Sequence, residues 1–453
     1  MTELTHPRVP DITGQVLTPE DQAYDDARAV FAAHVDARPA LIARVSGPDD
    51  IARVIAYARE TGSELAVRGG GHSPAGYGVC DGGITIDLSA LRSFDLDPTQ
   101  CTAWAGAGLT AGDFTLAAAE HRLATGFGDT GSVGIGGITL AGGIGFLVRK
   151  HGLTIDNLLA AEIVTADGRL RRVDAEIEPE LFWALRGGGG NFGVVTRLKY
   201  RLQPVDLVLG GLLVLPGTPD VLAGFVAEAE AAADELSTIA NVMRAPPLPF
   251  VPEALQGRLV VMATMVHTGD VDVGQRAVAP FRALAEPVAD LLRPMRYPEL
   301  FPDQPDNRLG RLTRTMFAGS VGRTQAECIL KGVGESSALM PACEMRVLGG
   351  AAARVPADAT AFAHRQSRVM INVQAIYDAA KSERAEHAAW ARGLAATLHD
   401  GDPGVYAGFL DDEGEERVRA AYPGATWERL AAVKAIVDPD NVFRLNQNIT
   451  PGT

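Results

Sequence analysis

Cysteine is scarce in this chain: the 453 residues contain four, Cys80, Cys101, Cys328 and Cys343. They are too few and too widely separated to form a disulfide framework. The sequence also contains no CxxC or HxxxH pair, a spacing by which many metal sites are recognised. We therefore expect free thiols in structural positions and no metal site.

Long apolar runs and basic clusters are also missing. Nowhere do about 18 apolar residues follow one another, so no membrane-spanning helix is expected. The opening residues, MTELTHPRVP, lack the basic and apolar regions of a secretory signal, which predicts a cytoplasmic protein. The formal net charge of −15 and the lack of a long Lys/Arg run disfavour nucleic acid or an anionic membrane as a partner. A small-molecule substrate is favoured instead.

What the chain does contain is typical of a globular protein long enough for two or three domains: 47% of its residues are hydrophobic and 21% are charged. Glycine clusters are dense in the first part. They nearly vanish in a second part, where strands alternate with helices rich in Ala and Glu. We expect an N-terminal domain of residues 1–204, to which residues 409–453 return, and a second domain of residues 205–408.

Apolar periodicity predicts the elements that frame the glycine clusters. Strands are expected at Leu41–Val45, Leu65–Val67, Gly82–Ser89 and Val194–Tyr200. A helix with Pro48 in its first turn should end at Gly62 and bury one face, made of Ile51, Val54, Ile55 and Ala58. A last helix, Trp427–Val437, should have an apolar face made of Leu430, Val433 and Ile436.

The stretch that says most about function is VRGGGHSPAGYG, residues 67–78. Its three glycines, Gly69, Gly70 and Gly71, let backbone N–H groups turn towards one anion and let a flat ring lie close to the main chain, which suggests a bound diphosphate. His72 follows on a constrained loop, where its imidazole could act as a nucleophile or ligand. The alternative is a glycine-rich turn with a solvated histidine.

A second glycine pattern, GGGNFG from Gly188 to Gly193, formally matches the GxGxxG pattern of nicotinamide dinucleotide-binding folds. In those folds the pattern ends a strand and opens a helix. Here an expected helix, containing Leu181 and Leu185, precedes it, and an expected strand follows it. The order is reversed, which disfavours a Rossmann domain.

Four motifs occur in a fixed order: VRGGGHS, the glycine-dense GFGDTGSVGIGGITLAGGIGF, ELFWALRGGGGNFGVVT and the C-terminal DPDNVFRLNQNI. In this order they resemble the berberine bridge enzyme-like branch of the vanillyl-alcohol oxidase (PCMH-type) flavoproteins, and most of all its bacterial 6-hydroxy-D-nicotine oxidase-like members. The resemblance extends from about Ala40 to the C-terminus. It implies an α+β protein with a PCMH-type FAD-binding fold and a substrate domain in which helices back an antiparallel sheet.

The resemblance also implies the cofactor and how it is held. In this family a glycine-flanked histidine, here His72, is bonded covalently to the 8α-methyl carbon of FAD. Many relatives add a second bond from a cysteine, but this chain has Thr130 at that position, so we expect a single attachment. Further contacts to FAD are implied for Arg68, Gly69, Gly70, Gly71, Ser73, Val133, Gly134, Gly137, Gly142, Gly143, Val195, Asn446 and Asn448.

The resemblance bears on the electron acceptor as well. Oxygen-reactive members tend to have valine beside the reactive carbon of the flavin, where poorly reactive ones have leucine. That position falls on Val133, which would leave room for O₂. The alternative is that Val133 is a β-branched residue that only fills space.

The sequence identifies the catalytic residues less clearly than the cofactor contacts. In the expected strand Arg368–Asp378, alternation places Tyr377 on one face and Asn372 and Gln374 on the other, and either face could look into a substrate cleft. A later segment, YAGF, matches a family segment that often reads YxNY, so Tyr406 is a further candidate. Because YAGF departs from the YxNY pattern, the sequence leaves open which residue acts as the catalytic base.

The implied function is two-electron oxidation of an alcohol or amine carbon, with hydride passing to FAD and O₂ reoxidising the flavin to give H₂O₂. The candidate catalytic residues are Tyr377, Tyr406, Asn372 and Gln374. Two alternatives remain open. One is a dehydrogenase that uses another electron acceptor, and the other is a non-catalytic flavin-binding protein. The substrate and the oligomeric state are not predicted.

Overall fold

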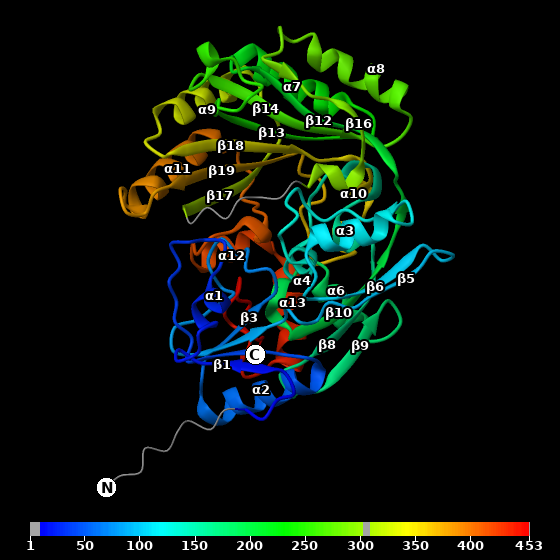
Figure 1. Ribbon diagram of the computed structural model, residues 1–453, viewed down its shortest axis with the longest axis vertical. Coiled ribbons are helices and arrows are strands. Elements are labelled where there is room, and N and C mark those ends of the chain that lie inside the picture. Colours follow the sequence, from blue (N-terminus) through cyan, green and yellow to red (C-terminus); the bar gives the residue numbers. More distant parts are fainter. Residues whose placement is uncertain (1–9, 302–308, 453) are drawn as a thin grey trace.

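The computed structural model describes residues 10–301 and 309–452. In Figure 1 it has a lower region with two main sheets and an upper region with one large sheet. The first lower sheet has four strands in the order β1-β2-β4-β3, in which β2, β3 and β4 are parallel and β1 is antiparallel. Their bounds are Gln15–Leu17, Leu41–Arg44, Leu65–Arg68 and Ile84–Asp87 for β1 to β4.

The second lower sheet has five antiparallel strands in the order β5-β6-β10-β8-β9. A short pair, β11 (Gln203–Pro204) with β7 (Leu123–Ala124), lies beside it. The five strands are β5 (Phe94–Asp97), β6 (Thr102–Gly106), β8 (Leu158–Val164), β9 (Leu170–Asp174) and β10 (Val194–Arg201). The helices of this region are α1 (Tyr24–Arg28), α2 (Pro48–Thr61), α3 (Ala111–Ala119), α4 (Ile135–Ala141), α5 (Val148–His151) and α6 (Pro179–Leu185).

The upper sheet has eight antiparallel strands, β12 to β19, and helices cover its outer face (Figure 1). Its apolar core lies between the sheet and these helices and includes Phe225, Phe281, Ile329 and Leu394. The other face of the sheet looks towards the lower region. The strands are β12 (Leu207–Pro216), β13 (Leu236–Arg244), β14 (Leu259–His267), β15 (Ala289–Asp290), β16 (Arg293–Arg296), β17 (Gly310–Ala318), β18 (Met340–Val347) and β19 (Val369–Tyr377).

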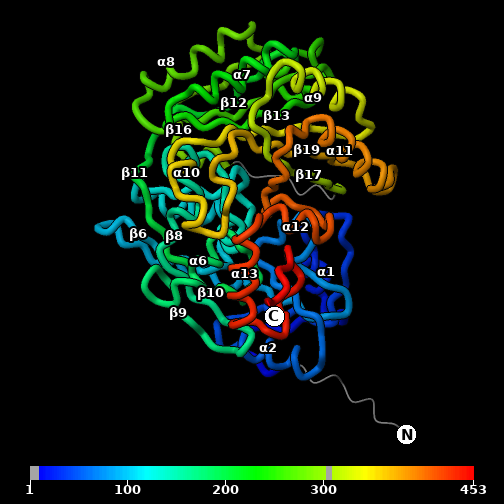
Figure 2. The backbone as a smooth tube through the Cα atoms, turned by 180° about the vertical axis from the view of Figure 1, so that it is seen from behind, coloured from blue at the N-terminus to red at the C-terminus, as the bar shows by residue number. Residues whose placement is uncertain are grey.

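The helices of the upper region are α7 (Pro219–Ala231), α8 (Val271–Arg282), α9 (Arg323–Glu335), α10 (Gly350–Arg354) and α11 (Arg384–Leu398). The chain then returns to the lower region through α12 (Glu415–Ala421) and α13 (Ala425–Val437). Seen from behind, the last segment lies among the N-terminal elements (Figure 2), where Phe443 joins the same apolar cluster as Val54 and Ile86. The α+β architecture predicted from the sequence is thus present, while the domain limits at 204 and 408 stay a prediction.

Local sequence signals explain α2 well. Ile51, Val54, Ile55 and Ala58 are all buried, as predicted, and the helix ends at Gly62, whose φ of +66° is the left-handed conformation that glycine adopts easily. The predicted strand on each side of the His72 loop is also confirmed, as β3 and β4. The GxGxxG segment lies between α6 and β10, so the prediction against a Rossmann domain is confirmed.

One prediction for the last helix is wrong. Leu430 and Val433 are buried, but Ile436 is 77% exposed. Successive residues of a helix are about 100° apart, so Ile436 lies about 120° around the helix from Leu430 and faces solvent. Lys434 is buried in its place.

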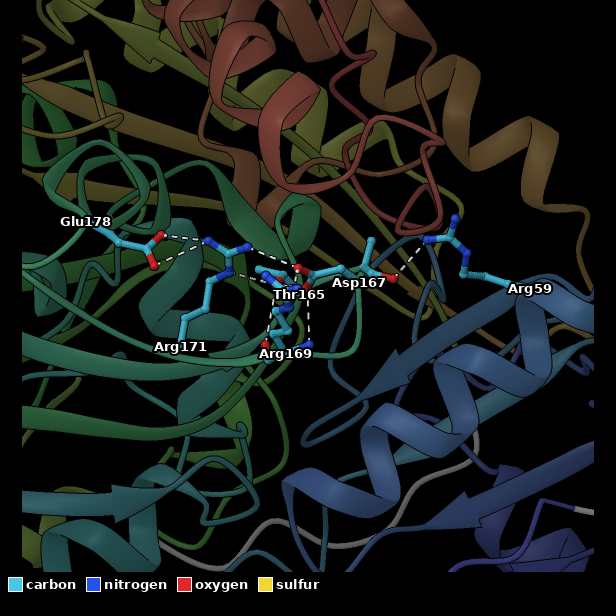
Figure 3. A network of polar contacts seen from close by, with 7 residues as sticks. Arg59, Thr165, Asp167, Arg169, Arg171 and Glu178 are labelled. Carbon is cyan, nitrogen blue, oxygen red and sulfur yellow. Dashed lines mark hydrogen bonds and ion pairs between the residues drawn. The ribbon is translucent and has the colours of Figure 1, made fainter.

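Polar contacts join the two lower sheets at the turn between β8 and β9 (Figure 3). Arg59, near the end of α2, donates to the carbonyl oxygen of Ala166 at 3.0 Å. On the other side of the turn, Arg171 pairs with Asp167 at 3.1 Å and with Glu178 at 3.2 Å. The Arg59 contact ties α2 to the five-stranded sheet, and the Arg171 contacts hold the turn between β8 and β9 in place.

Candidate active site

A cavity of about 620 Å³ lies between the lower region and the inner face of the upper sheet. Its floor comes from the segments 69–78, 128–141, 189–195 and 443–447, and its roof from β13, β17, β18 and β19. Of the residues predicted to contact a cofactor, those that line this cavity are Gly69, Gly70, Gly71, His72, Ser73, Thr130, Val133, Gly134, Gly137, Val195 and Asn446. The structure therefore brings three distant glycine-rich segments and the C-terminal segment to one place.

Two of these loops touch through their glycines. A Cβ atom added to Gly70 would lie 2.2 Å from the backbone nitrogen of Gly134, and one added to Gly134 would lie 2.3 Å from the nitrogen of Gly70. No side chain fits at either position without moving the main chain. The close approach leaves a smooth backbone surface on the cavity floor, which suits a flat ring and an anionic group.

His72 stands at the edge of this floor. Its ring stacks on Phe31 with a centroid distance of 4.2 Å and an angle of 23° between the planes. Burial, reinforced by the charge of Arg311, lowers the pKa of His72 from its ordinary value of 6.5 to about 4, against a hydrogen bond with the backbone of Ser132 that acts in the opposite direction. The imidazole is therefore uncharged at neutral pH, the form in which a ring nitrogen can act as a nucleophile.

The C-terminal segment adds hydrogen-bonding groups to the floor. The amide nitrogen of Asn446 donates to the carbonyl oxygens of Gly190 (3.2 Å) and Phe443 (3.0 Å), and that of Gln447 donates to Leu410 O (2.7 Å). Among the described residues, the side-chain oxygens of Asn446 and Gln447 and the hydroxyl of Tyr422 are buried without a partner, although all three residues line the cavity. Buried polar groups normally have a hydrogen-bond partner, so these three groups mark positions where a ligand can supply one.

A buried ion pair holds this segment in place. Lys434 of α13 and Asp438 have fully buried side chains that meet at 2.9 Å. The ammonium group also donates to the carbonyl oxygens of Asn191 (2.8 Å) and Phe443 (2.7 Å), and the carboxylate accepts from the backbone N–H groups of Val442 (2.8 Å) and Phe443 (2.9 Å). One contact network thus connects the GGGNFG loop to the C-terminal motif.

The roof carries a second buried polar group. On β18, Arg346 donates to Glu344 at 2.7 Å, to the carbonyl oxygen of Ile144 at 2.6 Å and, across the cavity, to Asp129 at 2.8 Å. The other oxygen of Glu344 accepts from Gln374 of β19 at 3.1 Å. Burial raises the pKa of Glu344 from its ordinary value, while Arg346 acts in the opposite direction. The roof thus holds a buried carboxylate whose two oxygens contact Arg346 and Gln374.

Two other candidates also face the cavity. Asn372 lies on β19 opposite Glu344, and its side-chain oxygen is buried without a partner among the described residues. The hydroxyl oxygen of Tyr406 accepts from the backbone N–H of Gly143 at 3.0 Å. Burial raises the pKa of Tyr406 from 10.0 to about 12. At neutral pH only about one Tyr406 in 10⁵ would be ionised.

Tyr377 requires a correction. The structure places it on the opposite face of β19, in the apolar core under the helices, where its ring lies 4.6 Å from that of His387. Asn372 and Gln374 line the cavity, so theirs is the face that looks into the cleft. Tyr377 is therefore a core residue and no longer a candidate base.

Four predicted cofactor contacts also lie outside the cavity lining: Arg68, Gly142, Gly143 and Asn448. The side chain of Arg68 lies behind the glycine loop, since a Cβ atom at Gly71 would meet its Nε at 3.5 Å. Gly143 has a φ of +77° and packs against Thr154, which a Cβ atom would strike at 1.9 Å. Packing against Thr154 is a reason for glycine at this position, and a contact of Gly143 with the cofactor stays a prediction.

Some lining residues were not predicted. Glu344 and Arg346 could have been found, because Ala342, Glu344 and Arg346 alternate along β18 in the same way that Gln374 and Asn372 do along β19. Phe31, Asp129 and Arg311 carry no local signal, since only the tertiary fold brings them to the cavity. Across residues 10–301 and 309–452, no three His, Cys, Asp or Glu side chains are grouped as metal ligands would be, and no helix is long and apolar enough to cross a membrane.

Comparisons with known proteins agree with this geometry. Residues 39–174 match the FAD binding domain family, and residues 405–450 match the berberine and berberine-like family. (R)-6-hydroxynicotine oxidase of Paenarthrobacter nicotinovorans is 32% identical to this chain over 458 residues, 97% of each protein. Among solved structures, 6-hydroxy-D-nicotine oxidase from Arthrobacter nicotinovorans has a TM-score of 0.88 at 29% identity, over 99% of this chain and 100% of that one.

A more distant structure shares the fold: glucooligosaccharide oxidase from Acremonium strictum, with a TM-score of 0.85 at 22% identity, over 97% of this chain and 98% of that one. Fold and cavity together define an FAD-linked oxidoreductase with separate flavin and substrate regions. More narrowly, the chain belongs to the berberine bridge enzyme-like family of these oxidoreductases.

The residues present fit FAD. The backbone surface at Gly70 and Gly134 suits a flat ring, and the unpartnered oxygens of Asn446 and Gln447 can accept from N–H or hydroxyl groups of a flavin or its ribityl chain. His72 would hold the ring at its edge. Thr130 lines the same cavity, but its hydroxyl cannot form a thioether.

Proposed function

We propose that this protein is an oxidase that carries FAD on His72 through one covalent bond and oxidises an alcohol or amine carbon of a small molecule, with O₂ as electron acceptor. The observation that supports it most is the uncharged, stacked His72 at the edge of a cavity whose roof holds a buried carboxylate. A glycine-rich turn with a solvated histidine would not have this burial.

Single attachment is part of the proposal. Glucooligosaccharide oxidase from Acremonium strictum has a 6-S-cysteinyl, 8α-N1-histidyl FAD, which is a flavin attached through two residues. In this chain His72 can supply the histidyl bond, whereas Thr130 stands where doubly attached relatives have cysteine. Only one of the two bonds can therefore form.

Bound FAD would accept a hydride from the substrate carbon and pass the electrons to O₂. Removal of that hydride is easier when a base takes the proton of the adjoining O–H or N–H group. Among the roof residues we assign this role to Glu344, because its carboxylate has a raised pKa and faces the cavity. Gln374 and Arg346 orient it through their hydrogen bonds.

Tyr406 has a different role in this proposal. A phenol with a pKa of about 12 is a poor base near neutral pH. Its oxygen already accepts from Gly143, so its O–H group is oriented by the main chain and can donate to the substrate. Asn372, whose oxygen lacks a protein partner among the described residues, would accept from the substrate.

The proposal that O₂ is the electron acceptor is supported by Val133. This residue lines the cavity, and its half-buried side chain is shorter than the leucine found in poorly oxygen-reactive relatives. We propose that the space beside it admits O₂. The partners are then a small-molecule substrate and O₂; a cytoplasmic location stays a prediction.

The test is anaerobic reduction with a panel of sugars, hydroxylated polyketides and cyclic amines. A substrate should bleach the bound flavin, and admission of air should restore its colour with one H₂O₂ per substrate oxidised. If no compound bleaches the flavin, the protein is better described as a flavin-binding protein. If bleached flavin persists in air, a dehydrogenase with another acceptor is the better description.

A further inference from the structure

A stack of three side chains lies at the His72 end of the cavity. The guanidinium carbon of Arg311 is 3.9 Å from the centre of the Phe31 ring, and the same ring stacks on the imidazole of His72 with a centroid distance of 4.2 Å. Phe31 belongs to the loop between α1 and β2, and Arg311 to β17 of the upper sheet. The stack therefore joins the N-terminal segment, the glycine loop and the substrate region.

The loop that carries Phe31 is fixed to the glycine loop. The backbone N–H of Phe31 donates to the carbonyl oxygen of Gly71 at 3.0 Å. Further along, Gly76 has a φ of +76°, and a Cβ atom there would lie 2.6 Å from a methyl group of Val35. The loop that carries Phe31 is thus held to the glycine loop by a backbone hydrogen bond on one side of His72 and by the packing of Val35 against Gly76 on the other.

Two consequences follow for the imidazole of His72. Its plane is set by the stacked ring on one face and by the hydrogen bond with the backbone of Ser132. Its charge is set first by burial, which disfavours the protonated form, and second by Arg311, because a protonated imidazole would place another cation against the ring that Arg311 contacts. The other ionisable groups near this end are Arg68 behind the loop, and Tyr77 and Asp129 on the cavity lining.

We propose that Phe31 and Arg311 are positioning residues for covalent attachment of the flavin: the stack aims the imidazole of His72 at the 8α-methyl carbon and keeps it uncharged until the bond has formed. This inference rests on the proposed function, since it assumes that His72 carries FAD. It assigns a role to two residues that do not themselves react.

In the attachment step a ring nitrogen of His72 forms a bond to the methyl carbon. The imidazole N–H proton and one methyl hydrogen leave with two electrons, and O₂ takes up both hydrogens and the electrons to become H₂O₂. The flavin ends oxidised. Protonated imidazole has no free lone pair on either nitrogen, so the step requires the uncharged form.

The experiment mixes full-length apoprotein with FAD in air and follows the flavin that survives acid precipitation, from pH 5.5 to pH 8. In the wild type, His72 has a pKa of about 4, so the rate should vary little over this range. Arg311→Met removes the second cause and leaves burial, so it should raise that pKa only part of the way towards 6.5. Attachment should then slow at pH 6 by less than about fourfold, the limit for a pKa of 6.5, with little change at pH 8.

Phe31→Leu removes the stacked ring. It should slow attachment at every pH, because the imidazole of His72 loses its alignment. Arg311→Lys keeps the charge and Phe31→Tyr keeps the ring, so both should attach FAD with wild-type kinetics. Phe94→Leu, which changes a ring packed on Phe114 away from the cavity, is the matched control and should have no effect.

Thermal unfolding and non-covalent FAD binding, measured on each variant, separate a folding defect from slow attachment. The inference is overturned if Phe31→Leu and Arg311→Met attach FAD at the wild-type rate and with its pH profile, or if Phe31→Tyr and Arg311→Lys are as slow as the disruptive variants. A different result, a wild type that retains no flavin in acid, would instead contradict the proposed function.

Discussion

Replacement of Lys434 by methionine tests how firmly the C-terminal motif is held to the flavin site. The ammonium group makes three contacts of 2.7–2.9 Å, with Phe443 O, Asn191 O and Asp438, and both side chains of the ion pair are fully buried. Methionine has a similar length but donates no hydrogen bond. The change would leave a buried carboxylate and two carbonyl oxygens without their donor.

Breaking a buried ion pair by removing one partner costs about 3–5 kcal/mol, because the remaining charge is uncompensated. That range corresponds to a factor of between about one hundred and a few thousand in the unfolding equilibrium. Asp438 keeps its two backbone donors, Val442 and Phe443, which places our expectation at the lower end of the range. The double change Lys434→Met/Asp438→Asn removes the stranded charge and should lose less stability than the single change.

Urea unfolding followed by tryptophan fluorescence measures the loss. Trp183 and Trp427 both lie in the apolar core of the lower region, so the signal includes the region that contains Lys434, together with a contribution from Trp390 of the upper region. Lys381→Met is the control, because Lys381 forms an exposed surface pair with Asp378 and its replacement should leave the curve unchanged. A loss of less than about 1 kcal/mol for Lys434→Met, with normal flavin content, would refute this reasoning.

Three further predictions concern chemistry. Val133→Leu should slow reoxidation of reduced flavin by O₂ at least tenfold, about 1.4 kcal/mol of barrier, and leave anaerobic reduction unchanged in stopped-flow traces; equal slowing of both half-reactions would mean that Val133 only fills space. Thr130→Ala should bind as much covalent flavin as the wild type on denaturing gels, and a lower yield would show that Thr130 takes part in attachment. Glu344→Gln should lower kcat by about 10²–10⁴-fold with unchanged flavin content, whereas the exposed Glu335→Gln should not. Because burial raises the pKa of Glu344 and the ionised form is the base, the wild-type rate should rise with pH through that pKa, and the same rise in Glu344→Gln would exclude it.

Much of the lower region could be predicted because its signals are local. The helix α2 has a proline start, a glycine end and one apolar face within a single segment, and the strands beside His72 adjoin the loop that they frame. The segments of the cavity floor were predicted from four sequence motifs that occur in the same order as in the family. In each case neighbouring residues carry the information.

The roof could be predicted only in part. Alternation along β19 separated Tyr377 from Asn372 and Gln374, but it could not say which face the helices α9 and α11 would cover, because those helices come from other parts of the chain. The stack of Phe31 on His72 and Arg311 on Phe31 joins positions that are far apart in sequence. No local sequence pattern predicts a side-chain contact between residues so far apart in the chain.

The central claim is that FAD is bonded to His72, and peptide mapping tests it most directly. Acid-precipitated wild-type protein should stay yellow, and mass spectrometry of its digest should find FAD on one peptide, the one that contains His72, and none on the peptide with Thr130. His72→Ala should release all its flavin in acid. Complete extraction of flavin from the wild type, or flavin on any peptide without His72, would contradict the account.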